Sequence, residues 1–247
     1  MKITLLGYGK MGRAVEKAAI GQGHVVIARL NEGWQETDIP SETEVVIEFS
    51  RPTEAADNIL RVLRLGLPIV SGTTGWLQDG LDQVTKAVKK YDGTLFYSSN
   101  FSIGVYLFRG LVRELSRRMN SFPAFSGVSM EEVHHIHKLD YPSGTALTVA
   151  TEDIIGELER KKRVQAYLSP APAPETEEDT LLIKSVREGE VAGIHRVEYL
   201  SPGVEAIRLE HESLGRDSLA KGAVMAAEFV LGKKGFFGMD DLMKSTH

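Results

Sequence analysis

The chain has 247 residues, 34 of them acidic and 29 lysine or arginine, which gives a formal net charge of −5 at pH 7. It contains no cysteine, which excludes disulfide bonds, a thiol nucleophile, cysteine-ligated zinc and iron–sulfur clusters. The length fits one large domain or two modest ones, and no apolar run is long enough to predict a membrane span. A mildly acidic chain does not suggest nucleic-acid binding, so we expect a cytoplasmic protein that binds neither nucleic acid nor a membrane.

The first hundred residues alternate between strand and helix patterns. Short apolar runs predict strands at 2–6, 24–30, 44–49, 67–71 and 94–98, the first of which we prefer to a leader peptide. Apolar residues at helical spacing predict helices at 11–20, 52–65 and 77–91. Because such alternation through short connections builds a parallel sheet with helices on its faces, the pattern predicts an α/β, doubly wound Rossmann-type fold.

Near residue 100 the pattern changes to that of a second, α+β domain with a mixed open sheet. Strands are predicted at 128–135, 181–186, 195–200 and 205–211, and helices at 105–119, 143–159 and 217–231. The proline-rich polar segment 169–179 is predicted to be a loop and the least structured part of the chain.

A glycine-rich turn joins the first predicted strand to the first predicted helix. Its sequence, Gly7-Tyr8-Gly9-Lys10-Met11-Gly12, is a complete G-x-G-x-x-G motif, and in this setting it predicts a dinucleotide site. Gly7 would permit the tight turn, Gly9 would let the backbone approach a pyrophosphate, and Gly12 would let helix and strand pack closely. A tight strand–helix turn without a ligand is the alternative interpretation.

The end of the second predicted strand bears on the choice of coenzyme. Glu32 would bind ribose hydroxyls and favours NAD, whereas Asn31 can bond a hydroxyl without repelling a phosphate. Arg13 and Arg29 could reach a 2′-phosphate, although strand alternation can aim Arg29 elsewhere. The residues leave the choice open, and we expect NADH, NADPH or both, with some preference for NADH.

Three polar turns follow the third, fourth and fifth predicted strands. They are Glu48-Phe49-Ser50-Arg51-Pro52, Ser71-Gly72-Thr73-Thr74-Gly75 and Ser98-Ser99-Asn100-Phe101. Each alone would be an ordinary turn. Because ligands bind at the carboxyl ends of parallel strands, three of them on one edge predict a shared cleft.

Histidines gather at the end of the strand predicted at 128–135: His134, His135 and His137 precede Lys138 and Asp140. A metal site is one interpretation, in which His135 and His137 would share a face of the strand, but no cluster of carboxylates at metal-ligand spacing supports it and we expect no metal. Proton transfer fits better, because the unperturbed pKa of histidine is about 6.5 and suits a general acid near neutrality. A solvated basic strand end is the remaining alternative.

The segment Pro142-Ser143-Gly144-Thr145 has the pattern of a helix start. Such a start supplies free N–H groups and hydroxyls that bind anions. With the cationic cluster a few residues earlier, this arrangement predicts a small substrate that carries two carboxylates.

These residues also carry a resemblance that extends over nearly the whole chain. The segment Glu132–Ala146, EVHHIHKLDYPSGTA, resembles the signature E-x-H-H-x-x-K-x-D-A-P-S-G-T-A of the 4-hydroxy-tetrahydrodipicolinate (dihydrodipicolinate) reductase family. Weaker matches lie at 7–12, 49–52, 72–75, 100–105, 187–195 and 235–239. The resemblance implies an NAD(P)H-dependent oxidoreductase of diaminopimelate and lysine biosynthesis.

The resemblance also implies residue roles. His134 would protonate the substrate ring after hydride transfer, and Lys138 would assist this step and hold a carboxylate. Substrate binding would fall to His135, Ser143, Gly144 and Thr145. The dinucleotide would contact Gly7 to Gly12 together with Gly72, Thr73, Thr74, Ser98, Ser99, Asn100 and Phe101, and we add Asn31 and Glu32.

The family resemblance implies a domain organisation and an assembly. Residues 1–100 would form the dinucleotide-binding domain, joined by the C-terminal segment 217–247. Residues 101–216 would form the domain for substrate binding and oligomerisation, and the protein would be a homotetramer.

The chain departs from the family pattern at a few positions. Glu48 stands where most members have Asp, Tyr141 replaces the Ala before Pro-Ser-Gly-Thr, and Asn31-Glu32 lacks an acid–Arg pair seen in some members. The alternatives to a reductase of this family are another two-domain NAD(P)-dependent dehydrogenase, of the aspartate or homoserine type, and a catalytically silent dinucleotide-binding sensor.

Overall fold

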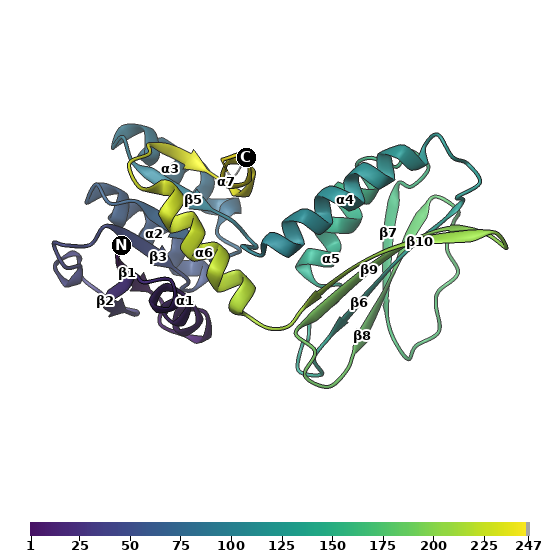
Figure 1. Cartoon of the computed structure of the whole chain (residues 1–247), viewed down its shortest axis with the longest axis horizontal. Helices are drawn as coiled ribbons and strands as arrows, with labels where there is room; N and C mark the ends of the chain where they lie inside the picture. Colours follow the sequence, from purple (N-terminus) through teal and green to yellow (C-terminus); the bar gives the residue numbers. More distant parts are fainter. Residues whose placement is uncertain (246–247) are drawn as a thin grey trace. The chain divides into compact units, whose positions relative to one another are not determined.

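The computed structural model describes residues 1–245, and the chain divides into two compact units (Figure 1). The first unit comprises residues 1–103 and the C-terminal segment from Arg216 onward, and the second comprises residues 104–215. Among the described residues, no helix is long and apolar enough to cross a membrane.

The first unit is built on a six-stranded, fully parallel sheet with the strand order β11-β5-β4-β3-β1-β2. Its strands are β1 (Lys2–Leu6), β2 (Val25–Leu30), β3 (Val45–Glu48), β4 (Ile69–Ser71), β5 (Thr94–Tyr97) and β11 (Gly235–Phe237). Its helices are α1 (Lys10–Gly21), α2 (Pro52–Arg64), α3 (Leu77–Lys90), α6 (Asp217–Val230) and α7 (Met239–Lys244), with a short 3₁₀ turn, η1 (Glu36–Asp38). The strand order reverses between β1 and β3, which is where ligands bind in such sheets.

Both faces of this sheet are buried, which explains the continuous apolar runs of its strands. Ile3, Leu5 and Ile47 point to the face covered by α1 and α6, where small residues such as Ala223 let the helix lie close. Alternate strand residues point to the opposite face and pack with side chains of α2 and α3. The predicted doubly wound α/β fold is confirmed.

The second unit has a five-stranded mixed sheet with the strand order β10-β9-β6-β8-β7. Its elements are α4 (Ile103–Met119), β6 (Gly127–His134), α5 (Gly144–Thr148), the π-helix η2 (Val149–Ile155), β7 (Arg163–Leu168), β8 (Thr180–Arg187), β9 (Gly193–Ser201) and β10 (Glu205–Ser213). The pairs β6–β8 and β7–β8 are parallel, whereas β6–β9 and β9–β10 are antiparallel. Side chains from α4, α5 and η2 pack with the sheet residues of this unit in one core.

Two features of the second unit differ from the sequence-based expectation. The single helix expected over 143–159 is an α-helix only as far as Thr148 and then widens into a π-helix that ends at Ile155. β7 was not predicted, because this edge strand is only half-buried and shows no clear alternation. The segment 169–179 contains no helix or strand and forms the long loop between β7 and β8 (Figure 1).

Candidate functional site

The glycine-rich turn lies between β1 and α1, and packing accounts for two of its three glycines. A Cβ on Gly7, which has a φ of +88°, would lie 2.1 Å from the carbonyl oxygen of Phe49. A Cβ on Gly12 would lie 2.4 Å from the carbonyl oxygen of Gly7. A Cβ on Gly9 would meet nothing within 4 Å, so the protein leaves open the position where a pyrophosphate would approach the backbone.

The N-terminus of α1 presents an uncompensated partial positive charge. Within the described chain, no side chain caps this end, and the first turn of the helix carries no acidic residue. Backbone N–H groups at a helix start bind phosphate oxygens, and the helix dipole favours the negative charge. This end of α1 therefore suits a dinucleotide.

A cavity of about 350 Å³ lies beside the turn, where the strand order reverses. Residues that line it include Gly7, Asn31, Glu32, Trp34, Arg51 and Asn58. The Oδ1 atom of Asn31 accepts a 2.9 Å hydrogen bond from the N–H of Tyr8, and Glu32 forms a 2.8 Å ion pair with Arg51. The structure thus brings Asn31 and Glu32 together with the glycine-rich turn.

Arg13 and Arg29, the two arginines that the sequence suggested for a 2′-phosphate, both contact residues of the turn or of α1. Arg29 is bonded to Glu16 of α1, as strand alternation allowed. The guanidinium of Arg13 lies over the ring of Tyr8, 5.1 Å from its centre. Neither arginine is among the residues that line the cavity beside Glu32.

The polar turns after β3, β4 and β5 lie along the same edge of the sheet, because these strands are neighbours. A Cβ on Gly72 would lie 2.0 Å from the Phe49 ring, which stacks edge-on with the ring of Phe101 at 5.9 Å. Phe101 is only 1% exposed, so its side chain belongs to the core and only its backbone could contact a coenzyme.

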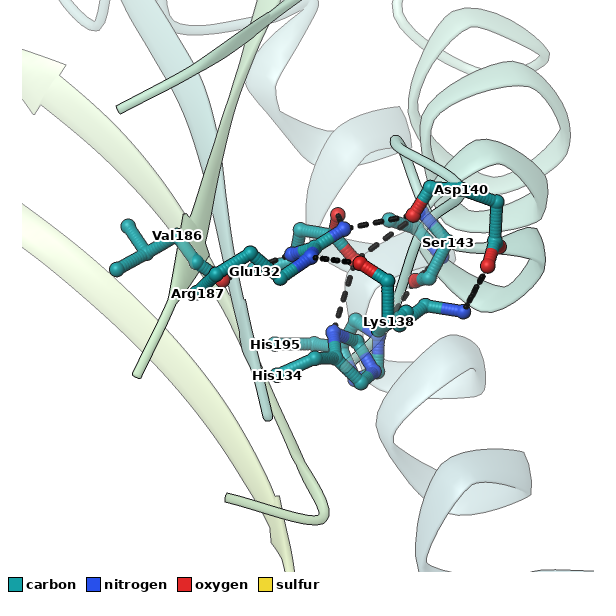
Figure 2. A network of polar contacts seen from close by, with 9 residues as sticks. Glu132, His134, Lys138, Asp140, Ser143, Val186, Arg187 and His195 are labelled. Atoms are coloured by element: carbon teal, nitrogen blue, oxygen red, sulfur yellow. Dashed lines mark hydrogen bonds and ion pairs between the residues drawn. The ribbon is translucent and has the colours of Figure 1, made fainter. Parts of the chain in front are cut away.

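The second unit holds a buried cluster of acid and base groups at the end of β6 (Figure 2). Strand alternation puts Glu132 and His134 on the same face, and both are buried. The Nδ1 atom of His134 lies 3.1 Å from Oε2 of Glu132, at ion-pair distance but without hydrogen-bond geometry. A Cβ on Gly193 would lie 3.0 Å from Nε2 of His134, so the glycine leaves that nitrogen uncrowded.

Several donors surround the Glu132 carboxylate (Figure 2). The N–H of Ser143 donates a 3.1 Å hydrogen bond to Oε2, and Nη2 of Arg187 donates a 3.3 Å bond to Oε1. Burial alone would raise the pKa of Glu132, but the neighbouring His134 and Ser143 outweigh it and hold that pKa well below its ordinary range. Glu132 is therefore a carboxylate beside His134 at neutral pH.

His195 of β9 completes the cluster. It pairs with Glu132 in the register between β6 and β9, and its ring centre lies 5.4 Å from that of His134. Burial, and after it the nearby His134, lowers the pKa of His195 to about 4, so this histidine is neutral at pH 7. Its Nε2 atom lies 3.3 Å from the hydroxyl of Ser143.

Sequence reasoning did not assign roles to Glu132, Arg187 or His195. All three lie within segments that carried the family resemblance, 132–146 and 187–195, which was the signal available. Their proximity depends on the pairing of β6 with β8 and β9, because His134 lies opposite Arg187 and Glu132 opposite His195.

Lys138 and His135 follow β6 in a turn. The Nζ atom of Lys138 bonds both carboxylate oxygens of Asp140, at 2.7 and 2.8 Å, and the Lys138 carbonyl accepts a 3.1 Å bond from Arg187 (Figure 2). The rings of His135 and His137 are 6.1 Å apart, and His137 lies 3.4 Å from Glu190 at the surface. The structure thus brings Lys138 into the polar network of Glu132 through Arg187.

The predicted helix start is present, and Ser143 is the N-cap residue of the helix. The Ser143 hydroxyl accepts a 3.2 Å bond from the N–H of Ala146, and α5 begins at Gly144. A Cβ on Gly144 would meet nothing within 4 Å. Ser143, Gly144 and Thr145 therefore lie next to the acid–base cluster, because Ser143 contacts both Glu132 and His195.

The residues that could hold a metal ion differ from the pair considered in the sequence. Ligand atoms of Glu132, His134 and His195 lie within 4.8 Å of one another. The Arg187 guanidinium beside Glu132 opposes a cation at this position, since it already pairs with the only carboxylate of the three. The absence of a metal stays a prediction.

A doubly wound domain with a dinucleotide-type turn, together with a buried acid–base cluster on a second domain, defines a dinucleotide-dependent oxidoreductase. The family model for the N-terminus of dihydrodipicolinate reductase matches residues 1–101, and the model for its C-terminus matches residues 104–243. The chain belongs to the dihydrodipicolinate reductase family.

Full-length relatives agree with this assignment. The chain is 37% identical to the 4-hydroxy-tetrahydrodipicolinate reductase of Christiangramia forsetii over 98% of each chain. It is 30% identical to that of Archaeoglobus fulgidus over 99% of this chain and all of the relative. A dipicolinate-bound dihydrodipicolinate reductase from Paenisporosarcina sp. TG-14 shares the fold, with a TM-score of 0.73, 21% identity and coverage of 98% of this chain and 99% of that one.

The resemblance inferred from the sequence is thus confirmed. The family is that of an NAD(P)H-dependent oxidoreductase of diaminopimelate and lysine biosynthesis, so this expectation is confirmed as well. Family models that together span residues 1–101 and 104–243 decide against the aspartate or homoserine dehydrogenase alternative.

Proposed function

We propose that this chain reduces 4-hydroxy-tetrahydrodipicolinate to tetrahydrodipicolinate with NADH or NADPH, and that water is released. The observation that carries the proposal is the buried cluster of Glu132, His134 and His195 beside Lys138. The full-length relatives of the chain are named 4-hydroxy-tetrahydrodipicolinate reductase. A silent dinucleotide-binding sensor would not need this acid–base cluster.

The coenzyme would lie on the first unit. Its pyrophosphate would contact the turn Gly7 to Gly12 and the start of α1, which fits the open space at Gly9. Gly72, Thr73, Thr74 and the backbone of Ser98 to Phe101 would contact it further along the edge of the sheet. When bound, the reduced nicotinamide supplies the hydride.

Coenzyme choice would depend on the paired side chains of Glu32 and Arg51. A carboxylate bonds the ribose hydroxyls of NADH and repels the 2′-phosphate of NADPH, whereas an arginine attracts that phosphate. Because the two side chains are 2.8 Å apart, each weakens the effect of the other. We therefore expect both coenzymes to react, with NADH preferred, as judged by kcat/KM for each.

The proton would come from His134 of the second unit. Glu132 would hold the protonated imidazole in place, and the absence of a Cβ at Gly193 would leave Nε2 uncrowded for the approach of the substrate ring. Lys138 and His135 would bind one carboxylate, and the N–H groups and hydroxyls of Ser143, Gly144 and Thr145 the other. Lys138 would leave Asp140 for the substrate carboxylate.

The domain roles and the assembly are part of this proposal. Residues 1–100 with 217–247 would bind the dinucleotide, and residues 101–216 would bind the substrate and form the subunit contacts of a homotetramer in the cytoplasm. Light scattering after size-exclusion chromatography would give a mass near four chains.

The test is oxidation of NADH in the presence of freshly generated dihydrodipicolinate synthase product. We expect turnover by the wild-type chain, and a kcat lower by about 10²- to 10⁴-fold in His134→Gln and Lys138→Ala, the range for loss of a general acid. NADH affinity should be unchanged in both variants. Tight NADH binding by the wild type without turnover would instead favour the sensor.

A further inference from the structure

A fully buried carboxylate, Glu48, ends β3 beside two of the turns assigned to the coenzyme. Its Oε1 atom accepts hydrogen bonds from the Ser50 N–H at 2.8 Å, from the Ser50 hydroxyl, and from the Thr73 hydroxyl at 2.7 Å. Its Oε2 atom accepts a 2.6 Å bond from the hydroxyl of Ser71, which lies opposite Glu48 in the β3–β4 pairing. One side chain thus joins the turn after β3 to the turn after β4.

The same contacts extend to the lining of the cavity beside the glycine-rich turn. The Ser50 hydroxyl accepts a 3.1 Å bond from Asn58, whose Oδ1 accepts a 2.7 Å bond from the indole N–H of Trp34. Ser50, Asn58 and Trp34 all line that cavity. Glu48 is therefore the innermost group of a network that reaches both stretches of the coenzyme surface.

We propose that Glu48 is a positioning residue for the coenzyme: its carboxylate fixes the turns 49–51 and 72–74 in the arrangement that binds NADH. The inference rests on the proposed function, which places the coenzyme on these turns. Glu48 has no exposed surface and so acts through Ser50 and Thr73 instead of touching the coenzyme. The Ser50 N–H can only donate, and a carboxylate accepts at both oxygens, whereas an amide accepts at one.

The experiment compares the wild type with Glu48→Gln and Glu48→Asp in the full chain. Dissociation constants for NADH come from fluorescence titration, and KM and kcat from steady-state kinetics. We expect Glu48→Gln to weaken NADH binding by about tenfold or more, the loss typical of a buried hydrogen bond to a charged group. KM for NADH should rise with it, while KM for the dicarboxylate substrate changes less than twofold. Glu48→Asp keeps the charge and should bind NADH more tightly than Glu48→Gln.

A matched control is Thr43→Val, which removes the buried 2.8 Å hydrogen bond between the hydroxyls of Thr4 and Thr43 in the same unit, away from both turns. It should lower the melting temperature without changing NADH affinity. If Glu48→Gln also loses only melting temperature, Glu48 is structural and the inference fails while the proposed function stands. If the wild type itself binds neither NADH nor NADPH, the proposed function fails and this inference falls with it.

Discussion

Two successive glutamates of β6 have very different environments, because only one of them belongs to the acid–base cluster. Glu132 and Glu131 are neighbours in β6, but they point to opposite faces of the sheet. Glu131 pairs with Lys184 and Arg196, at 2.8 and 2.7 Å, on a partly exposed face. Glu132 is buried beside His134. Replacing either glutamate by glutamine removes one negative charge from β6, but only the change at Glu132 removes it from the acid–base cluster.

We predict that Glu132→Gln lowers kcat by at least about tenfold and leaves NADH affinity unchanged. In this variant the His134 imidazole loses the carboxylate that lies 3.1 Å from its Nδ1 atom, so the general acid is held and oriented less well. Steady-state kinetics and NADH titration would measure both quantities. Glu131→Gln should leave kcat within about twofold of the wild type, and equal losses of kcat in both variants would contradict the role given to Glu132.

The depressed pKa of His195 makes a second prediction, on stability. Its folded-state pKa is about 4 and its ordinary value is 6.5, so the unfolded chain binds the extra proton between these values. Stability contributed at this site is therefore intact above about pH 6.5 and is lost as the pH falls towards 4. His195→Gln should flatten the pH dependence of the free energy of unfolding between pH 5 and 6.5, as measured by urea denaturation.

Other groups set the useful window for that measurement. Burial also lowers the pKa of His211, whose ring centre lies 6.4 Å from that of His195. His211 therefore contributes to the pH dependence in the same window, and the slope of His211→Gln is measured beside that of His195→Gln to separate the two histidines. The lowered pKa of Glu132 acts only below its ordinary value of 4.5, outside the window. An unchanged slope in His195→Gln would mean that this histidine already titrates normally in the folded chain.

Among the elements of the chain, the sequence predicted those whose pattern of apolar residues follows directly from how they are buried. The strands β1, β3, β4 and β5 are mostly apolar and buried because helices cover both faces, and the motif at Gly7 to Gly12 marks the end of β1. The sequence also indicated His134, Lys138 and the helix start at Ser143, because they are contiguous. It could not bring His195 next to Glu132, since that contact depends on strand register.

The π-helix η2 was unpredictable for a related reason. Seven residues are too few for periodicity to distinguish π from α, and the contacts of its Asp153 are tertiary. Fully buried, Asp153 receives hydrogen bonds from Nε and Nη2 of Arg109, at 2.6 and 3.1 Å, and from Nη2 of Arg113, at 2.7 Å. Burial would lower the pKa of Arg109, but Asp153 outweighs it and the pKa is raised. These bonds join η2 to α4.

We predict that Asp153→Asn destabilises the second unit by about 2–4 kcal/mol, because it leaves two arginines facing a buried neutral amide. The matched control is Glu114→Gln on α4, whose partners Arg117 and Arg118 are exposed, and it should cost much less stability than Asp153→Asn because solvent screens these ion pairs. Hydrogen exchange read out on peptides of α4 and β6 would assign the loss to this unit. Equal effects of the two variants would argue against an element-joining role for Asp153.

For the whole molecule, net charge is a poor guide to the site. The chain carries −5, yet the end of β6 gathers Lys138, Arg187 and histidines around one buried carboxylate. Such local fields decide ligand charge, because screening limits the reach of distant surface charges to about 10 Å at 0.1 M salt. A doubly anionic substrate therefore fits an acidic chain.

The course of the chain is a second property of the whole molecule. The first unit is closed by α6, which follows the second unit in sequence and packs with α1 on the sheet. Its fit is tight at Gly222, where an added Cβ would lie 1.9 Å from the carbonyl oxygen of Phe101. This contact, made by a helix that follows the second unit in sequence, thus supports the turn after β5 that is proposed to bind the coenzyme.

We predict opposite effects for the same substitution at two helical glycines. Gly222→Ala must displace α6 or the backbone at Phe101 and should destabilise the first unit by about 1–3 kcal/mol or more, with weaker NADH binding. Gly110→Ala lies in α4, where a Cβ meets nothing within 4 Å, and should stabilise the second unit by about 1 kcal/mol because alanine favours helix. Thermal unfolding and NADH titration of both variants would measure this. If Gly222→Ala left both stability and NADH affinity unchanged, α6 would tolerate a methyl group at this position, and its contact with Phe101 would not fix the turn.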